Sequence, residues 1–108
     1  MIAEKICSII QKRISTDDEW YYGIEKCWKE EIEILTKNID DTILFLENEC
    51  TSDEFSWLSE VFDDVAEQSQ SKEFVDCLHH VANKYPEECK KYHIYRIIQS
   101  AEDSLVEN

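Results

Sequence analysis

Glycine and proline are almost missing from this chain, which holds one of each in 108 residues. Typical usage is about 7% glycine and about 5% proline. Tight hairpins between strands need such residues at their turns, whereas helices joined by short polar links do not. The scarcity therefore predicts an all-α fold. A chain of this length forms one domain, here 1–108, and can bury a core without a metal or a disulfide.

Apolar residues recur at helical spacing along the whole chain. Capping signals divide the apolar pattern into separate helices. These signals are the two Thr-x-x-Glu boxes at 16–19 and 51–54, the further N-caps Asn38 and Ser71, and Pro86 at a helix start. The expected helices are 2–15, 17–37, 39–50, 52–68, 72–85 and 86–106. Short links make neighbours antiparallel. We expect a single compact domain of about six antiparallel helices, as a bundle or a short HEAT-like stack of hairpins.

The same spacing predicts which side chains face inward. In the helix over 52–68, the expected core face is Phe55, Leu58, Val61, Phe62 and Val65. Elsewhere the inward set includes Ile14, Trp20, Tyr21, Ile24, Trp28, Ile32, Leu35, Ile43, Leu44, Leu46, Tyr92 and Tyr95, whereas Tyr22 is expected to be exposed. Gly23 sits early in a predicted helix, where a close contact would explain it.

Negative charge is concentrated in one part of the sequence. The formal net charge is −14, and residues 17–69 carry 17 acidic side chains against Lys26, Lys29 and Lys37. Such a field repels nucleic acid and anionic membranes and attracts a basic protein. We therefore expect a basic protein partner, and neither direct nucleic-acid binding nor membrane binding.

The cysteines and the N-terminus indicate the compartment. The five cysteines are odd in number and contain no CxxC pair, and Lys5 interrupts the apolar start of the chain. No run reaches the length of a membrane-spanning helix. These features predict a reduced, cytoplasmic protein without a secretory signal, whose cysteines act mostly as small buried hydrophobic residues.

Candidate catalytic and metal sites are weak. The adjacent acids at 30–31, 40–41 and 63–64 diverge by about 100° on a helix, which favours a solvated face over an acid–base pair. Cys77, His80, Cys89 and His93 could form a four-ligand zinc site, but the short stretch 81–88 between the pairs does not match the usual finger layout. No nucleophile is marked by an adjacent base. We expect no enzyme activity and no cofactor, with zinc as a weak alternative.

An acidic arc lies opposite the core face of the helix over 52–68, and Trp57 lies at its flank. An indole beside carboxylates suits an interface with a basic partner, although Trp57 could equally fill a groove against a neighbouring helix. The predicted partner-binding residues are Asp53, Trp57, Glu60, Asp63, Asp64 and Glu67, with Tyr22, Glu30, Glu33, Glu47 and Glu49 on the preceding helices.

Four phrases carry a family resemblance: TSDEFSWLSEVFDD at 51–64, QSKEF at 70–74, KYPEE at 84–88 and YHI at 92–94. Together they resemble small acidic helical immunity proteins of bacterial contact-dependent growth inhibition and other polymorphic toxin systems. The resemblance covers roughly residues 20–100. It implies a cytoplasmic, monomeric inhibitor that binds the toxin domain of a cognate effector, often a nuclease, in a 1:1 complex.

The charge distribution fits the same function on physical grounds, because a nuclease needs positive charge to hold phosphates and an acidic face can occupy that groove. Three alternatives remain at the level of the sequence. One is a nucleic-acid-mimic inhibitor of a DNA-binding protein, for which an elongated, often dimeric array of charges is typical. The second is the small zinc-binding helical domain. The third is a helical adaptor that binds a peptide in an apolar groove.

Overall fold

The computed structural model describes residues 2–17 and 19–106, and every regular element in this part of the chain is helical. The elements are α1 (Ile2–Ser15), α2 (Tyr21–Lys37), α3 (Ile39–Asn48), α4 (Ser52–Leu58), the 3₁₀ turn η1 (Ser59–Val61), α5 (Phe62–Ser69), α6 (Lys72–Ala82), α7 (Pro86–Lys91) and α8 (Ile94–Asp103). The predicted all-α class is confirmed.

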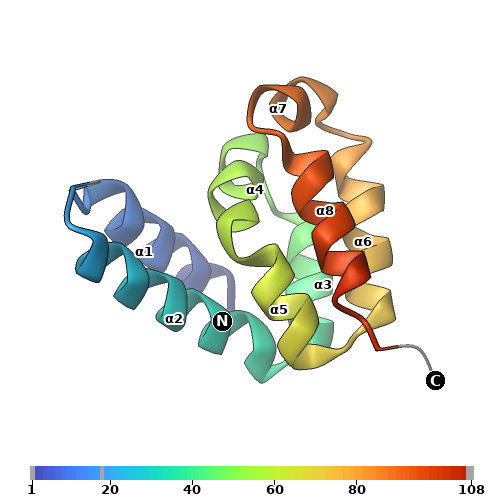
Figure 1. Cartoon of the computed structure of the whole chain (residues 1–108), viewed down its shortest axis with the longest axis horizontal. Helices are drawn as coiled ribbons and strands as arrows, with labels where there is room; N and C mark the ends of the chain where they lie inside the picture. The colour runs from blue at the N-terminus through green and yellow to red at the C-terminus, as the bar shows by residue number, and fades with distance from the viewer. Residues whose placement is uncertain (1, 18, 107–108) are drawn as a thin grey trace.

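Two parts can be followed in Figure 1. Helices α1 and α2 form an antiparallel hairpin that extends beside a bundle made of α3 to α8. Within the bundle, α5 packs against α8 and α3 against α6. The hairpin contacts the bundle through α3, α4, η1 and α5. The whole measures 38 × 29 × 27 Å, so it is one compact body.

Three predicted N-caps are present. Asn38 Oδ1 accepts a hydrogen bond from the Asp41 N–H at 3.2 Å, and Ser71 Oγ accepts from the Phe74 N–H at 3.1 Å. The box at 51–54 closes in both directions: the Thr51 N–H donates to Glu54 Oε1 at 2.9 Å and the Glu54 N–H to Thr51 Oγ1 at 3.1 Å. These caps set the starts of α3, α4 and α6.

The box predicted at 16–19 is wrong. Thr16 Oγ1 donates to the Lys12 carbonyl at 2.7 Å, so it belongs to the end of α1, and α2 begins only at Tyr21. As a result Trp20 and Tyr21 are 60% and 64% exposed, although the sequence placed both in the core. The close contact at Gly23 is with this same turn, because an added Cβ would come within 2.4 Å of the Trp20 indole.

Two segments predicted as single helices are broken. The segment 52–68 is interrupted by η1, where Ser59 Oγ donates to the Ser56 carbonyl at 2.6 Å. The segment 86–106 is interrupted at His93, which adopts a left-handed conformation with φ 56°. These breaks change the helix register. Tyr92 and Tyr95 beside the second break are exposed rather than inward, and Ile14 and Leu44 are exposed as well.

The predicted core face of residues 55–65 is confirmed, with all five side chains fully buried. Aromatic rings continue it: the Phe55 and Phe62 centroids are 5.1 Å apart, and Phe62 and Phe74 are 6.2 Å apart. Four of the five free cysteines, Cys27, Cys50, Cys77 and Cys89, are buried as the sequence predicts, and Cys7 is exposed. Burial raises the pKa of both the Cys50 and the Cys77 thiols to about 12.

Among the described residues, no helix is both long enough and apolar enough to cross a membrane.

Candidate functional site

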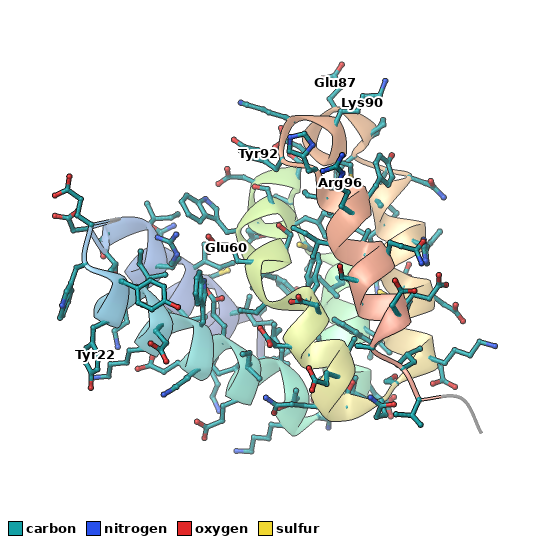
Figure 2. All side chains as sticks on the ribbon, in the orientation of Figure 1. Tyr22, Glu60, Glu87, Lys90, Tyr92 and Arg96 are labelled. Carbon is teal, nitrogen blue, oxygen red and sulfur yellow. The ribbon has the colours of Figure 1, made fainter. Side chains whose placement is uncertain are left out.

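The structure divides the predicted acidic face into carboxylates with internal partners and carboxylates without them. Glu60 is the clearest case of the first kind. It lies between the hairpin and α4 (Figure 2), where Oε1 accepts from Arg13 Nε at 2.9 Å and Oε2 from Arg13 Nη2 at 3.0 Å. The Trp28 indole N–H also donates to Oε1, at 3.2 Å. Glu60 therefore joins three helical segments, and its placement on the outward arc was wrong.

The physical reason for this error is the 3₁₀ turn. Glu60 is its central residue, and such a turn advances about 120° per residue instead of about 100°. The partner is also invisible to a local pattern, because Arg13 lies 47 positions away in the sequence. The Arg13 side chain is itself buried, and its guanidinium carbon lies 5.3 Å from the centroid of the Trp57 ring.

Glu30 and Glu47 also have internal partners. Lys12 Nζ lies 3.2 Å from Glu30 Oε1, which joins α1 to α2. Glu47 Oε2 lies 2.6 Å from His80 Nδ1 on α6, and Lys84 Nζ donates to the Glu47 carbonyl at 2.8 Å. Glu47 therefore faces α6.

A buried carboxylate that the sequence reading assigned to solvent is Glu31. Its exposed fraction is 0%, and neither carboxylate oxygen has a hydrogen-bond partner among the described residues. Burial, and to a lesser extent the nearby Glu60 carboxylate, raise the pKa of Glu31 to about 8, against the opposing effect of Arg13. A signal was present, because Glu31 continues the helical stripe of Ile24, Trp28 and Leu35.

The α5 patch, defined as Asp63, Asp64 and Glu67, is the opposite case. These side chains share the first turns of α5, and none of them forms a salt bridge within residues 2–17 and 19–106. Partial burial raises the pKa of Asp64 from its ordinary value, and Asp63 and Glu67 raise it further. Like charges at these spacings disfavour the helix. This patch therefore holds negative charge that the described part of the protein does not neutralise.

Asp53 and Trp57 lie elsewhere, along a groove between α4 and the α7–α8 turn. The groove has a volume of about 370 Å³ and is lined by Asp53, Ser56, Trp57, Ser59, Glu60, Tyr92 and Ile97. Trp57 is half-buried, so it both packs beside Arg13 and contributes a wall of this groove. We call this feature the α4–α8 groove.

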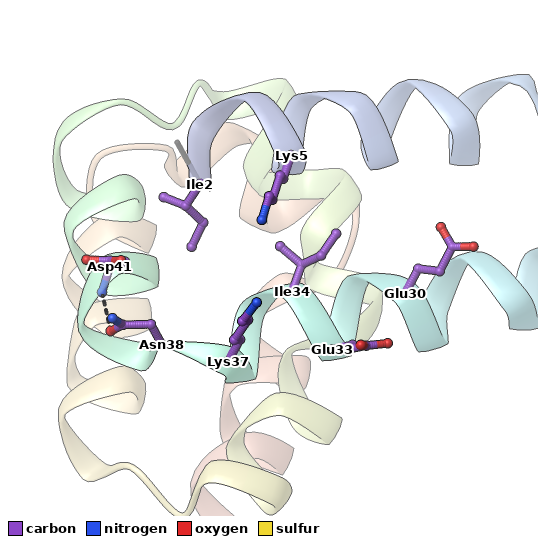
Figure 3. Close-up of a pocket in the computed structure, with 8 residues that line it drawn as sticks. All are labelled: Ile2, Lys5, Glu30, Glu33, Ile34, Lys37, Asn38 and Asp41. Carbon is purple, nitrogen blue, oxygen red and sulfur yellow. Dashed lines mark hydrogen bonds between the residues drawn. The ribbon is translucent and has the colours of Figure 1, made fainter.

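The remaining predicted residues do not join either feature. Tyr22 is 72% exposed and lies at the outer end of the hairpin, far from Tyr92 in Figure 2. Glu33 lines a groove of about 570 Å³ between the hairpin and α3, which it shares with Lys5 and Lys37 (Figure 3). Glu49 is exposed just after α3. The eleven predicted residues thus do not form a single face.

The four-residue zinc alternative is wrong. Among the described residues, no three histidine, cysteine or acidic side chains are grouped so that they could hold a metal ion. The buried Cys77 and Cys89 thiols lie 3.9 Å and 3.7 Å from the Ile43 and Ala82 carbonyls. His80 pairs with Glu47 instead, as described above.

Sequence reasoning missed Ser56, Ser59, Tyr92 and Ile97 as lining residues of the α4–α8 groove. Only Ser56 gave a signal, because a hydroxyl beside Trp57 on the side away from the core suggests an accessible surface, whereas Ser59 is buried. Tyr92 was assigned to the core because the break at His93 was not expected.

Comparisons with protein-family models, curated proteins and solved structures found no match to this chain.

Proposed function

We propose that this protein is an immunity protein that neutralises a basic toxin domain, in the nuclease class, by stoichiometric binding in the cytoplasm. The proposed binding surface includes the α5 patch and, as a second contact, Asp53 of α4 in the α4–α8 groove. The proposal requires no catalysis by the protein and no cofactor. The observation that carries it is the α5 patch, whose three carboxylates have no salt-bridge partner among the described residues.

The α5 patch keeps three like charges close together on one short helix. Asp63 and Asp64 lie in the first turn of α5, where the helix dipole favours carboxylates, but their repulsion with Glu67 one turn later opposes that gain. A basic partner would remove the repulsion and gain charge-assisted hydrogen bonds. Electrostatic attraction would also raise the association rate by roughly 10- to 1,000-fold, which matters for an inhibitor that must act before its target.

The support underneath the patch is rigid. Phe62, Val65 and Ala66 of α5 are fully buried, and α5 packs along α8. Rigid carboxylates lose little freedom on binding, so more of the electrostatic attraction contributes to affinity. A compact body of 38 × 29 × 27 Å fits a plug for one active site better than an elongated imitation of a duplex.

The proposal is tested in cells with a basic toxin domain, sought among the products of the genes adjacent to this one. Co-expression of the wild-type chain should restore growth. The double reversal of Asp64→Lys and Glu67→Lys should reduce protection, while a Glu73→Lys and Asp76→Lys control on α6 changes the net charge equally and should protect. Failure of the wild-type chain both to protect and to bind the purified toxin domain would refute the function.

A further inference from the structure

We propose that the α4–α8 groove is the receptor for one arginine side chain of the basic partner, with Asp53 as its counter-ion. This inference rests on the proposed function, because it assigns part of the surface through which that partner binds. It is carried by the hydrogen-bonding chemistry of the groove, by its aromatic walls and by an arginine that this protein already holds in the same way.

The groove offers acceptors rather than donors. Ser56 Oγ donates its proton to the Asp53 carbonyl at 2.8 Å, and Ser59 Oγ donates to the Ser56 carbonyl at 2.6 Å. The half-buried Ser56 hydroxyl can therefore meet a ligand only as an acceptor, whereas Ser59 is buried beneath it. The Asp53 carboxylate adds two more acceptor oxygens, and it has no salt-bridge partner in the described part of the chain. Such a lining excludes anions and favours a group rich in N–H donors.

A guanidinium group fits this lining best. It has five N–H donors and no acceptor, and its flat surface stacks on aromatic rings. Trp57 and Tyr92 line the groove together with Ile97, which can contact the methylene groups of an arginine. None of the described residues that line the groove is basic. Lys91 Nζ lies 5.2 Å from the centroid of the Tyr92 ring, so an incoming arginine would share that ring with Lys91.

Arg13 shows the same mode of recognition inside the protein. Its guanidinium pairs with the Glu60 carboxylate at 2.9 and 3.0 Å and lies 5.3 Å from the centroid of the Trp57 ring. Glu60 and Trp57 also line the groove, whereas Arg13 does not. Trp57 would then separate two arginines, one from α1 and one from the partner. Figure 2 shows Glu60 on the side of the groove that faces the hairpin and Tyr92 above it.

The experiment is an NMR titration of the full chain with N-acetyl-arginine methylamide, using the neutral citrulline analogue and the lysine analogue as matched probes. Saturable shifts confined to residues 53–60 and 92–97 are expected with arginine. Asp53→Asn should weaken this binding about tenfold, as loss of one charge-assisted hydrogen bond would. Asp64→Asn, which removes an equal charge from the α5 patch, should change it less than about twofold.

Equal binding of arginine and citrulline, equal binding of lysine, or shifts spread over all acidic residues would overturn the inference. So would equal effects of the two aspartate substitutions. The titration needs no toxin, so it separates the two proposals. Protection in cells without arginine binding would refute the role of the groove and leave the proposed function intact. Arginine binding by a chain that neither protects cells nor binds the toxin domain would refute the proposed function.

Discussion

The bundle core and the seam under the α1–α2 hairpin differ in the polar groups that they bury. Inside the bundle, Phe55, Phe62 and Phe74 are fully buried and pack ring against ring. Under the hairpin, the buried groups include the Arg13 guanidinium and the Glu31 carboxylate, beside the half-buried Glu60. Ile6, Ile10 and Leu35 of the hairpin join the same apolar core, so the seam differs because it buries a guanidinium and a carboxyl group in addition to apolar side chains.

This difference predicts different contributions to stability. Apolar burial stabilises by about 25 cal/mol for each Å² removed from water. A buried ion pair returns little net stabilisation, because desolvation offsets much of the attraction, but it fixes how two surfaces meet. The bundle should therefore supply most of the free energy of unfolding. The seam should set the position of the hairpin and be the first part to open.

The largest expected effect is in the core. Phe62→Ala removes a fully buried ring and should lower the free energy of unfolding by about 3–5 kcal/mol. Leu44→Ala, at an exposed position on α3, should change it by less than about 0.5 kcal/mol. Chemical denaturation measures both. A small loss for Phe62→Ala would contradict the assignment of the bundle as the main source of stability.

Breaking the seam should cost somewhat less and act locally. Arg13→Met leaves Glu60 and Glu31 close together without that cation, and we expect a loss of about 3 kcal/mol. Lys12→Met, one residue earlier, removes only the exposed pair with Glu30 and should cost about 0–1 kcal/mol.

Hydrogen exchange adds a local readout for Arg13→Met. Amides of α1 and α2 should lose more protection than those of α5 and α8. Equal losses throughout the chain would show that the hairpin and the bundle unfold as one unit.

The third effect is a pH dependence. Glu31 has a pKa of about 8 in the folded protein and about 4.5 when unfolded, so the folded state holds a proton that the unfolded state loses between these values. Stability due to this group is therefore complete below about pH 4.5 and falls as the pH rises toward 8. Each unit of pKa difference corresponds to about 1.4 kcal/mol.

Glu31→Gln should remove this slope, because an amide cannot ionise. Because the two pKa values differ by about 3.5, we expect the variant to gain up to about 4–5 kcal/mol over the wild type as the pH rises to 8, and almost nothing at pH 4. Denaturant titrations at a series of pH values measure the difference. A difference that stays constant from pH 4 to pH 8 would mean that Glu31 is ionised throughout.

The smallest effect compares two threonines that share one sequence motif. Thr51→Ala removes a capping box that is present and should cost about 1 kcal/mol. Thr16→Ala removes one hydrogen bond to the Lys12 carbonyl and should cost less than about 0.5 kcal/mol. Thermal unfolding resolves the two. Similar losses would mean that the structural difference between the boxes has no energetic consequence.

The sequence was informative where neighbours in the chain decide the outcome. Asn38, Thr51 and Ser71 act within one helical turn, and each caps the helix that it was predicted to cap. The core face over residues 55–65 survived the break at η1, because large apolar side chains tolerate a modest change of register. The fold class followed from these local signals and from the lack of turn residues.

The candidate site depended on contacts between distant segments, which local patterns do not contain. Glu60 binds Arg13 of α1 instead of standing on an outward arc. Glu47 pairs with His80 of α6. Glu31 was predicted to be solvated because it was read as a pair with Glu30. Its position on the helix is on the inward stripe, and it is buried. The α4–α8 groove exists only because α7 and α8 turn at His93 and bring Tyr92 to Trp57.

The central claim is that unpaired carboxylates bind the partner, while the seam carboxylates hold the fold. The most direct measurement is the association rate with the toxin domain that the chain protects against, followed as the salt concentration rises. The account predicts that Asp64→Lys with Glu67→Lys slows association and flattens its salt dependence, whereas Glu73→Lys with Asp76→Lys leaves both close to wild type. Equal effects of the two double reversals, or none from the first, would contradict it.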